Sequence, residues 1–126
     1  MLDYKTLFND DPSFERYVFK DYTAKSLPDN ECELLISKTK VVLINHSPYN
    51  KADYGFTVRT SAIDALNLGL TTSPTNTDHD FYPCIFIHTK SLESYKDEVP
   101  QLFIPFSLDT KKELINEIYY KLISVI

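Results

Sequence analysis

Three histidines and the carboxylates beside them are the residues of this 126-residue sequence best suited to chemistry. Asp78, His79 and Asp80 are consecutive, and imidazole and carboxylate groups bind divalent metals and transfer protons. His46 and His88 each follow an apolar run, so a hydrolytic site would require the fold to bring all three histidines together. Successive side chains of an extended chain point in opposite directions, which favours a solvated loop around His79. We therefore expect no metal and no other cofactor.

Glycine spacing argues against the common phosphate-binding and hydrolase motifs. The sequence contains two glycines, Gly55 and Gly69. A phosphate-binding loop or a dinucleotide fingerprint needs clustered glycines, because the backbone must approach the phosphates closely. A nucleophile elbow needs Gly-x-Ser-x-Gly, and that pattern does not occur either. The sequence therefore predicts a protein that is not an enzyme.

The charge balance predicts a protein partner rather than a nucleic acid or a membrane. The formal net charge is -5, from 13 Lys and Arg against 18 Asp and Glu. The sequence has no basic stripe of the kind that neutralises nucleic-acid phosphates, and an acidic surface repels anionic membranes. The same charge would attract a basic protein, or would serve only to keep this one soluble.

Aromatic and acidic residues are interleaved in several expected loops, which is typical of an interaction surface. The sequence has nine Tyr and eight Phe, and these side chains offer a large contact area with few rotatable bonds. The alternative is that each ring simply forms part of the core. We expect a partner-binding surface composed of Asp53, Tyr54, Asp78, His79, Asp80, Tyr82, Glu93, Tyr95 and Asp97.

Size, acidity and aromatic loops together favour a small acidic protein-binding or inhibitor protein. The most concrete hypothesis is a bacterial immunity protein, or antitoxin, that neutralises a cognate toxin by binding its basic domain directly. One alternative is a secretion-type chaperone that binds an effector segment, suggested by fold-level analogy. The other is a small metal- or His-dependent hydrolase or nuclease. Either a monomer or a homodimer is compatible with these hypotheses.

Composition predicts one globular domain over residues 1–126, because 43% of the residues are hydrophobic and 25% are charged. No apolar run approaches the roughly 20 residues that span a bilayer. The N-terminal residues lack the basic region and apolar core of a secretory signal, so we expect a cytoplasmic protein. Cys32 and Cys84 are too few to replace a core with disulfides, and both thiols are expected to be reduced.

Four segments are expected to form strands. Residues 41–44 are a short run of mostly β-branched side chains, typical of a central strand. Residues 54–60 alternate aromatic or aliphatic side chains with small or polar ones, as a half-buried strand does. These two segments are expected to pair in antiparallel fashion. Residues 81–89 and 102–106 are further apolar runs.

The clearest helix is expected at the C-terminus, over residues 110–126. Apolar side chains recur there at about every 3.6 residues and would form a wide buried face. Thr110 and Glu113 fit a capping box, and Asp109 or Ser107 could cap the helix instead. At the N-terminus, residues 12–20 have a helix start signal, with a strand over residues 17–19 as the alternative.

The middle of the chain is ambiguous between helix and strand. Residues 29–39 favour a helix, because acidic side chains come early and lysines late. The alternative is a hairpin of 32–37 and 40–46 turning at Lys38 and Thr39, although that turn lacks the usual Gly or Asn.

Three shorter segments complete the predicted element order. Residues 62–68 favour a short helix between a Ser61 cap and a Gly69 stop. Residues 71–80 are a polar loop, and 91–98 could form one helical turn. The predicted fold class is therefore α+β, with a mainly antiparallel four- to five-stranded sheet packed against N- and C-terminal helices.

Overall fold

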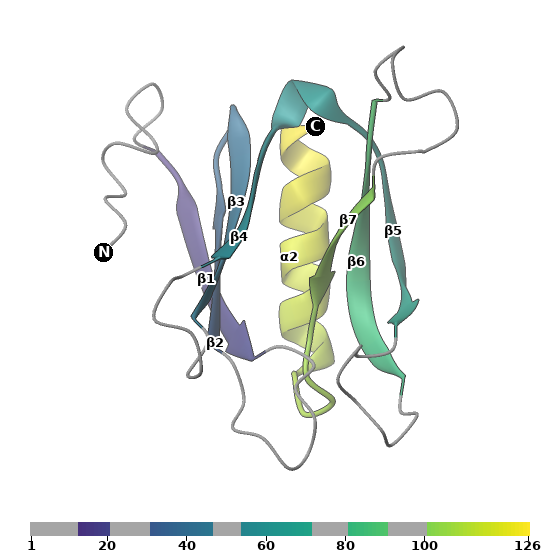
Figure 1. Cartoon of the computed structure of the whole chain (residues 1–126). Helices are drawn as coiled ribbons and strands as arrows, with labels where there is room; N and C mark the ends of the chain where they lie inside the picture. The colour runs from purple at the N-terminus through teal and green to yellow at the C-terminus, as the bar shows by residue number, and fades with distance from the viewer. Residues whose placement is uncertain (1–12, 21–30, 47–53, 72–80, 91–100) are drawn as a thin grey trace.

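Two antiparallel sheets and one long helix make up the computed structural model, which describes residues 13–20, 31–46, 54–71, 81–90 and 101–126 (Figure 1). The first sheet, sheet A, has the strand order β1-β2-β3-β4, and the second, sheet B, has the order β5-β6-β7. The elements are β1 (Glu15–Lys20), β2 (Glu31–Ile36), β3 (Lys40–His46), β4 (Tyr54–Arg59), the 3-10 turn η1 (Thr60–Ala62), β5 (Ile63–Thr71), β6 (Tyr82–Thr89), β7 (Gln101–Pro105) and α2 (Lys112–Val125).

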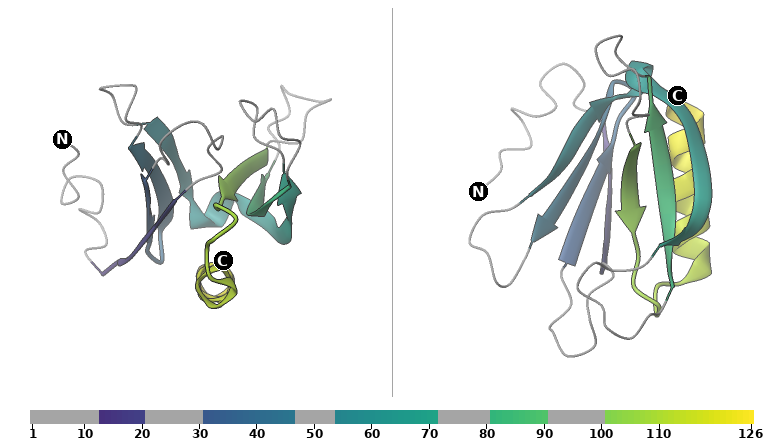
Figure 2. Two further views of the ribbon diagram at one scale, coloured as in Figure 1. Left: turned by 90° about the horizontal axis from the view of Figure 1, so that it is seen from below. Right: turned by 45° about the vertical axis from the view of Figure 1, so that its right-hand side comes forward.

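The expected single sheet packed against helices at both ends of the chain is wrong. The two sheets face each other, η1 connects them at one end, and α2 runs between them along one side (Figures 1 and 2). Within the described part of the chain, α2 is the one α-helix, and no helix there is long and apolar enough to cross a membrane. The expected loop over 71–80, apart from Thr71, and the helical turn at 91–98 lie outside the described residues.

The segment expected to be a second helix is β2, and the alternative hairpin is correct. β2 pairs with β3 from Glu31 opposite His46 to Ile36 opposite Val41. The Ser37 backbone N–H donates to the Lys40 carbonyl at 3.0 Å, and the Ser37 hydroxyl oxygen accepts from the backbone N–H groups of Thr39 and Lys40, both at 3.1 Å. The turn therefore contains no Gly or Asn, and the hydrogen bonds to the Ser37 side chain stabilise it instead.

The expected N-terminal helix is also wrong, because the segment forms the edge strand β1. Phe19 lies opposite Cys32 of β2, and its ring packs against Phe106 with centroids 4.7 Å apart. Tyr17 also faces the core, whereas Val18 between them is 40% exposed. Successive side chains therefore point to opposite faces, as they do in a strand. The strand alternative for this segment is confirmed.

The expected short helix over 62–68 is wrong, since those residues begin β5. β5 pairs with β6 along its length, with a register shift between Ile63 and Ala65. Gly69, interpreted as a helix stop, lies inside this strand, where a Cβ atom would come within 2.6 Å of the Phe86 ring. Gly69 therefore makes room for an aromatic ring on the neighbouring strand.

The remaining expected elements are confirmed. Residues 41–44 lie within β3, which pairs with β4 in antiparallel fashion, and the two later apolar runs form β6 and β7. The C-terminal helix α2 is present, but no side chain caps it, since Lys111 is the N-cap without a side-chain hydrogen bond. The Ser107 hydroxyl instead donates to Asp109 at 2.5 Å, which lowers the pKa of that carboxyl group.

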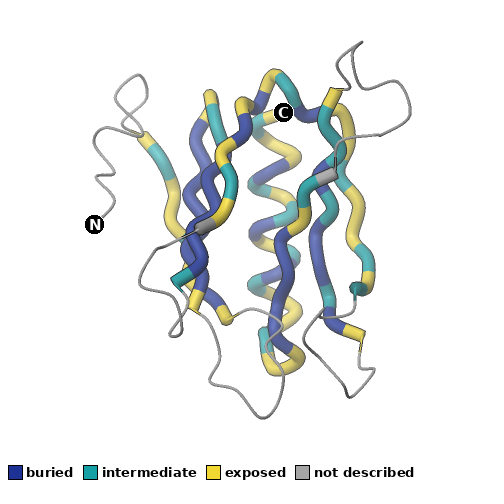
Figure 3. The backbone as a smooth tube through the Cα atoms, viewed as in Figure 1, coloured by how far each residue is buried: buried dark blue, intermediate teal, exposed yellow. Residues whose placement is uncertain are grey.

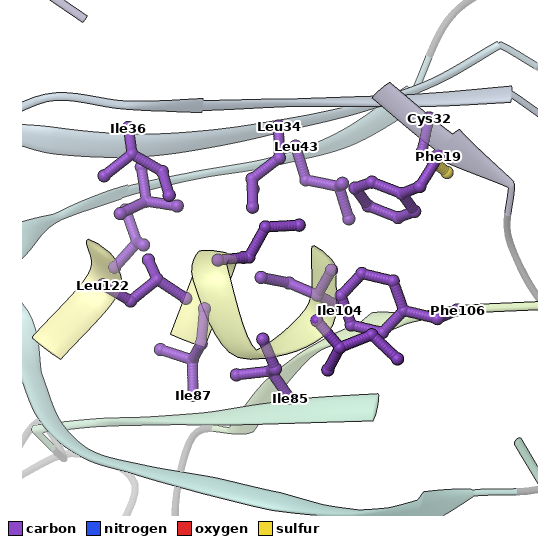
Figure 4. Packing of buried hydrophobic residues seen from close by; sticks show 14 of the residues in the cluster. Phe19, Cys32, Leu34, Ile36, Leu43, Ile85, Ile87, Ile104, Phe106 and Leu122 are labelled. Carbon is purple, nitrogen blue, oxygen red and sulfur yellow. The ribbon is translucent and has the colours of Figure 1, made fainter. Parts of the chain in front are cut away.

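The core lies between the sheets, around the inner side of α2 (Figure 4). Leu34 of sheet A, Ile85 of sheet B and Ile118 of α2 are all 0% exposed and belong to one cluster. Each such side chain contributes roughly 1.5–3 kcal/mol by leaving water. Polar contacts at the margin join α2 to β1: Lys121 Nζ lies 3.1 Å from Glu15 Oε1. The pKa of Glu15 is lowered, first by the hydrogen bond from the Tyr17 hydroxyl and then by Lys121.

The outer face of sheet A, which is turned away from α2, is buried at its centre. Leu35, Val42 and Ile44 form a second cluster there, with exposed fractions of 0%, 3% and 3%, and Phe14 packs against it. In Figure 3 the two central strands of sheet A, β2 and β3, are therefore largely dark blue, whereas β5 is mostly yellow and teal. Burial on two faces explains why β2 has no alternating pattern in the sequence.

Candidate functional site

Most of the residues expected to bind a partner fall on segments that the structure does not describe. Seven of the nine lie outside the described residues: Asp53, Asp78, His79, Asp80, Glu93, Tyr95 and Asp97. Tyr54 is the first residue of β4, and its backbone pairs with Asn45. Tyr82 is the first residue of β6 and is 3% exposed, so its ring is enclosed and is not available as an exposed anchor in this conformation.

The two described histidines do not converge. His46 is on the outer face of sheet A, because Val41 and Leu43 of the same strand face the core. His88 is on the outer face of sheet B, and its Nε2 lies 3.0 Å from the amide nitrogen of Asn67. The core separates these two faces. Among the residues that the structure describes, no group of three or more His, Cys, Asp or Glu side chains could hold a metal.

His46 instead belongs to an ionic cluster around Glu33. Arg16 Nε donates to Glu33 Oε1 at 2.8 Å, and Arg16 Nη2 contacts the same oxygen. His46 Nε2 lies 3.0 Å from Glu33 Oε2. Glu33 is 5% exposed and both of its oxygens are engaged, as a buried carboxylate requires. The cluster joins β1, β2 and β3 and is best explained as structural.

The clearest unusual surface lies at the end of sheet B that is farthest from η1. Leu68 and Leu70 of β5 are 49% and 64% exposed, and Phe81, the residue before β6, is 62% exposed. Leu68 lies opposite the buried Ile85, so Leu68 and Leu70 share the inner face of the sheet beyond the point where the core covers it. We call Leu68, Leu70 and Phe81 the β5–β6 patch.

The position of β5 adds backbone groups to this surface. β5 is an edge of sheet B, and β6 is its partner in that sheet. An edge strand presents backbone N–H and C=O groups on one side that can pair with another extended segment. The β5–β6 patch therefore combines exposed apolar side chains with an edge suitable for strand addition.

Acidic residues are next to the patch in the sequence. The segment that joins β5 to β6 contains Asp78 and Asp80, and Asp80 directly precedes Phe81. The described residues contain nine of the 13 Lys and Arg but only seven of the 18 Asp and Glu. The net negative charge is thus contributed by residues outside the described ranges, which include this segment.

Sequence interpretation missed Leu68 and Leu70 because it placed a helix over most of β5. The signal was present: Leu66, Leu68 and Leu70 alternate with Asn67 and Gly69, which is the period of a strand. No protein-family model matches this chain, and a search of curated proteins finds no match. Function is therefore inferred from the geometry of the surface alone.

Proposed function

We propose that this protein is a small protein-binding inhibitor of the immunity-protein type, which holds a basic partner domain against the β5–β6 patch. The observation that carries the proposal is the exposure of Leu68, Leu70 and Phe81, about half or more of each side chain, at one end of one sheet. Large apolar side chains that gather on a surface mark interaction sites more often than isolated ones do.

The chemistry of the patch matches the usual anatomy of a protein interface. Apolar side chains form the patch, and the sequence directly before Phe81 contributes the negative charges of Asp78 and Asp80, as the polar surroundings of an apolar interface do. A net charge of -5 would steer a basic partner towards the protein and raise the association rate. The edge of β5 can accept a strand from the partner, so that main-chain hydrogen bonds add to the apolar contacts.

The alternative functions have less support. The chaperone hypothesis came from analogy with the predicted fold, in which helices at both ends pack against one sheet, and the described elements do not form that fold. The hydrolase hypothesis needed the histidines to meet, and His46 and His88 lie on the outer faces of different sheets. No contact among the described residues favours either alternative.

The proposal is tested with a basic protein encoded next to this gene. The two proteins are co-expressed, and the affinity of the purified pair is measured by calorimetry at low and high salt. A 1:1 complex that weakens with salt is expected, and the double variant Leu70→Gln with Phe81→Gln should bind at least about tenfold more weakly. Leu108→Gln is the matched control, because Leu108 is 55% exposed but lies between β7 and α2.

Two outcomes would contradict the proposal. One is equal affinity for the wild type and the double variant, which would remove the β5–β6 patch from the interface. The other is self-association of the wild type, detected by light scattering and abolished by the double variant, because the patch would then join two copies of this chain.

A further inference from the structure

A basic cavity lies at the opposite end of the molecule, where β2 turns into β3 and β4 runs into η1. Its volume is about 460 Å³, within the range of small-molecule sites. All of its lining residues are polar: Lys38, Thr39, Lys40, Thr57, Arg59, Thr60 and Ser61. Among the described residues, the lining thus offers three cations and four hydroxyl groups and includes no carboxylate, in a protein whose net charge is -5.

The strand register brings two of the cations together. Lys40 of β3 lies directly opposite Arg59 of β4, and both are on the outer face of sheet A because the neighbouring pair, Val41 and Val58, faces the core. Like charges directly opposite each other on neighbouring strands destabilise a sheet. An anion bound between these two side chains would be attracted by both of their charges.

Hydrogen bonds hold the walls of the cavity in place. The Thr60 backbone N–H donates to the Thr39 carbonyl at 2.9 Å, and the Thr60 hydroxyl donates to the Lys38 carbonyl at 2.6 Å. These bonds tie the turn between β2 and β3 to the start of η1, and Ser37 closes the same turn from inside. A cavity with fixed walls loses less conformational entropy when a ligand binds.

We propose that this cavity binds a small phosphorylated compound, with its phosphate group between Lys40 and Arg59. A guanidinium group matches two phosphate oxygens at once, and the lysine ammonium groups act as point charges. The hydroxyl groups of Thr57 and Ser61 can donate to the remaining oxygens. The cavity exceeds the size of a phosphate ion, which favours a phosphate ester of a small polar molecule. The site is independent of the β5–β6 patch.

The test titrates the ¹⁵N-labelled full-length chain with inorganic phosphate, pyrophosphate and glycerol 3-phosphate. Amide signals of Thr39, Lys40 and Thr60 should shift at millimolar ligand or below, and the same ligands should raise the melting temperature, because they bind the folded state. Arg59→Gln should weaken binding at least tenfold, while its dispersed amide signals in phosphate-free buffer show that the variant is folded. Lys112→Gln removes one exposed charge from α2 and should bind as the wild type does.

Three results would overturn the proposal. The first is the absence of any shift with all three probes at millimolar concentration. The second is equal weakening by Arg59→Gln and Lys112→Gln, which would indicate a general charge effect. The third is association only with vesicles that carry phosphorylated headgroups, since the phosphate would then be recognised on a membrane surface and not on a soluble ester.

Discussion

Sheets A and B are both built from antiparallel strands adjacent in the sequence, but they are covered differently. In sheet A, Leu34 and Leu35 of β2 face opposite sides and are both 0% exposed. In sheet B, Ile85 of β6 is 0% exposed, whereas Leu68 and Leu70 of β5 are 49% and 64% exposed. The difference teaches that β2, at the centre of sheet A, serves as scaffold on both faces, and that sheet B combines a buried centre with one end available for interaction.

The largest loss of stability is expected from a substitution of Ile118 in α2, which lies in the core between the two sheets. This side chain is 0% exposed and belongs to the cluster that includes residues of both sheets. Ile118→Asp would bury a charge without a partner, which costs several kcal/mol against a total stability of about 5–15 kcal/mol. We expect the variant to be unfolded by circular dichroism and by the loss of dispersed amide signals.

Ile123→Asp is the matched control, because Ile123 is on the same helix but 43% exposed. This variant should fold. An Ile118→Asp protein with the melting temperature of the wild type would show that α2 does not hold the two sheets together. The buried core could then no longer be distinguished from the exposed end of sheet B by its contribution to stability.

Where the sequence predicted structure correctly, local pattern and tertiary environment agree. The β-branched run at 41–44 forms part of β3, and the 3.6-residue period after Lys112 forms α2. β2 was mistaken for a helix because both of its faces are buried, so its side chains do not alternate in polarity. Burial of Glu33 depends on Arg16 from another strand, a partner that no local pattern indicates.

The β5–β6 patch was not predictable from the sequence pattern alone, because the exposure of its side chains depends on tertiary structure. Asp78 and Asp80 were expected to bind a partner, and they precede Phe81 in the sequence but lie outside the described residues. The exposure of Leu70 follows from how far the core extends under β5, which is a tertiary property. Tyr82 was expected to be exposed because it is next to a loop, yet its position in β6 encloses it.

A pair of identical substitutions compares the two sheets directly. Leu35→Ala on the outer face of sheet A removes a fully buried side chain and should lower the free energy of unfolding by about 2–5 kcal/mol. Leu70→Ala in sheet B should lower it by less than about 0.5 kcal/mol, because Leu70 is 64% exposed. Urea denaturation measures both values. Similar losses for the two variants would mean that the end of β5 is as well covered as sheet A.

The smallest expected effect on stability comes from a buried thiol on the outer face of sheet B. It tests whether the centre of that face is closed to solvent. Cys84 of β6 is on that face, opposite Gly69, and is 1% exposed. Burial raises the pKa of its thiol from 9.0 to about 11. Between pH 9 and 11 the unfolded chain releases the thiol proton more readily than the folded protein does, so this group makes stability fall as pH rises.

Urea denaturation at pH 8, 9 and 10 measures this decline in the free energy of unfolding. The decline should be steeper in the wild type than in Cys84→Ala, and the difference in slope should correspond to the release of at most one proton. At pH 8 the native thiol should react slowly with a disulfide reagent, because its thiolate fraction is small and access is restricted. Reaction of Cys84 at the rate of a free thiol would show that the outer face of sheet B is open at its centre. Sheet B would then be exposed at its centre as well as at one end, and the β5–β6 patch would no longer be a distinct surface.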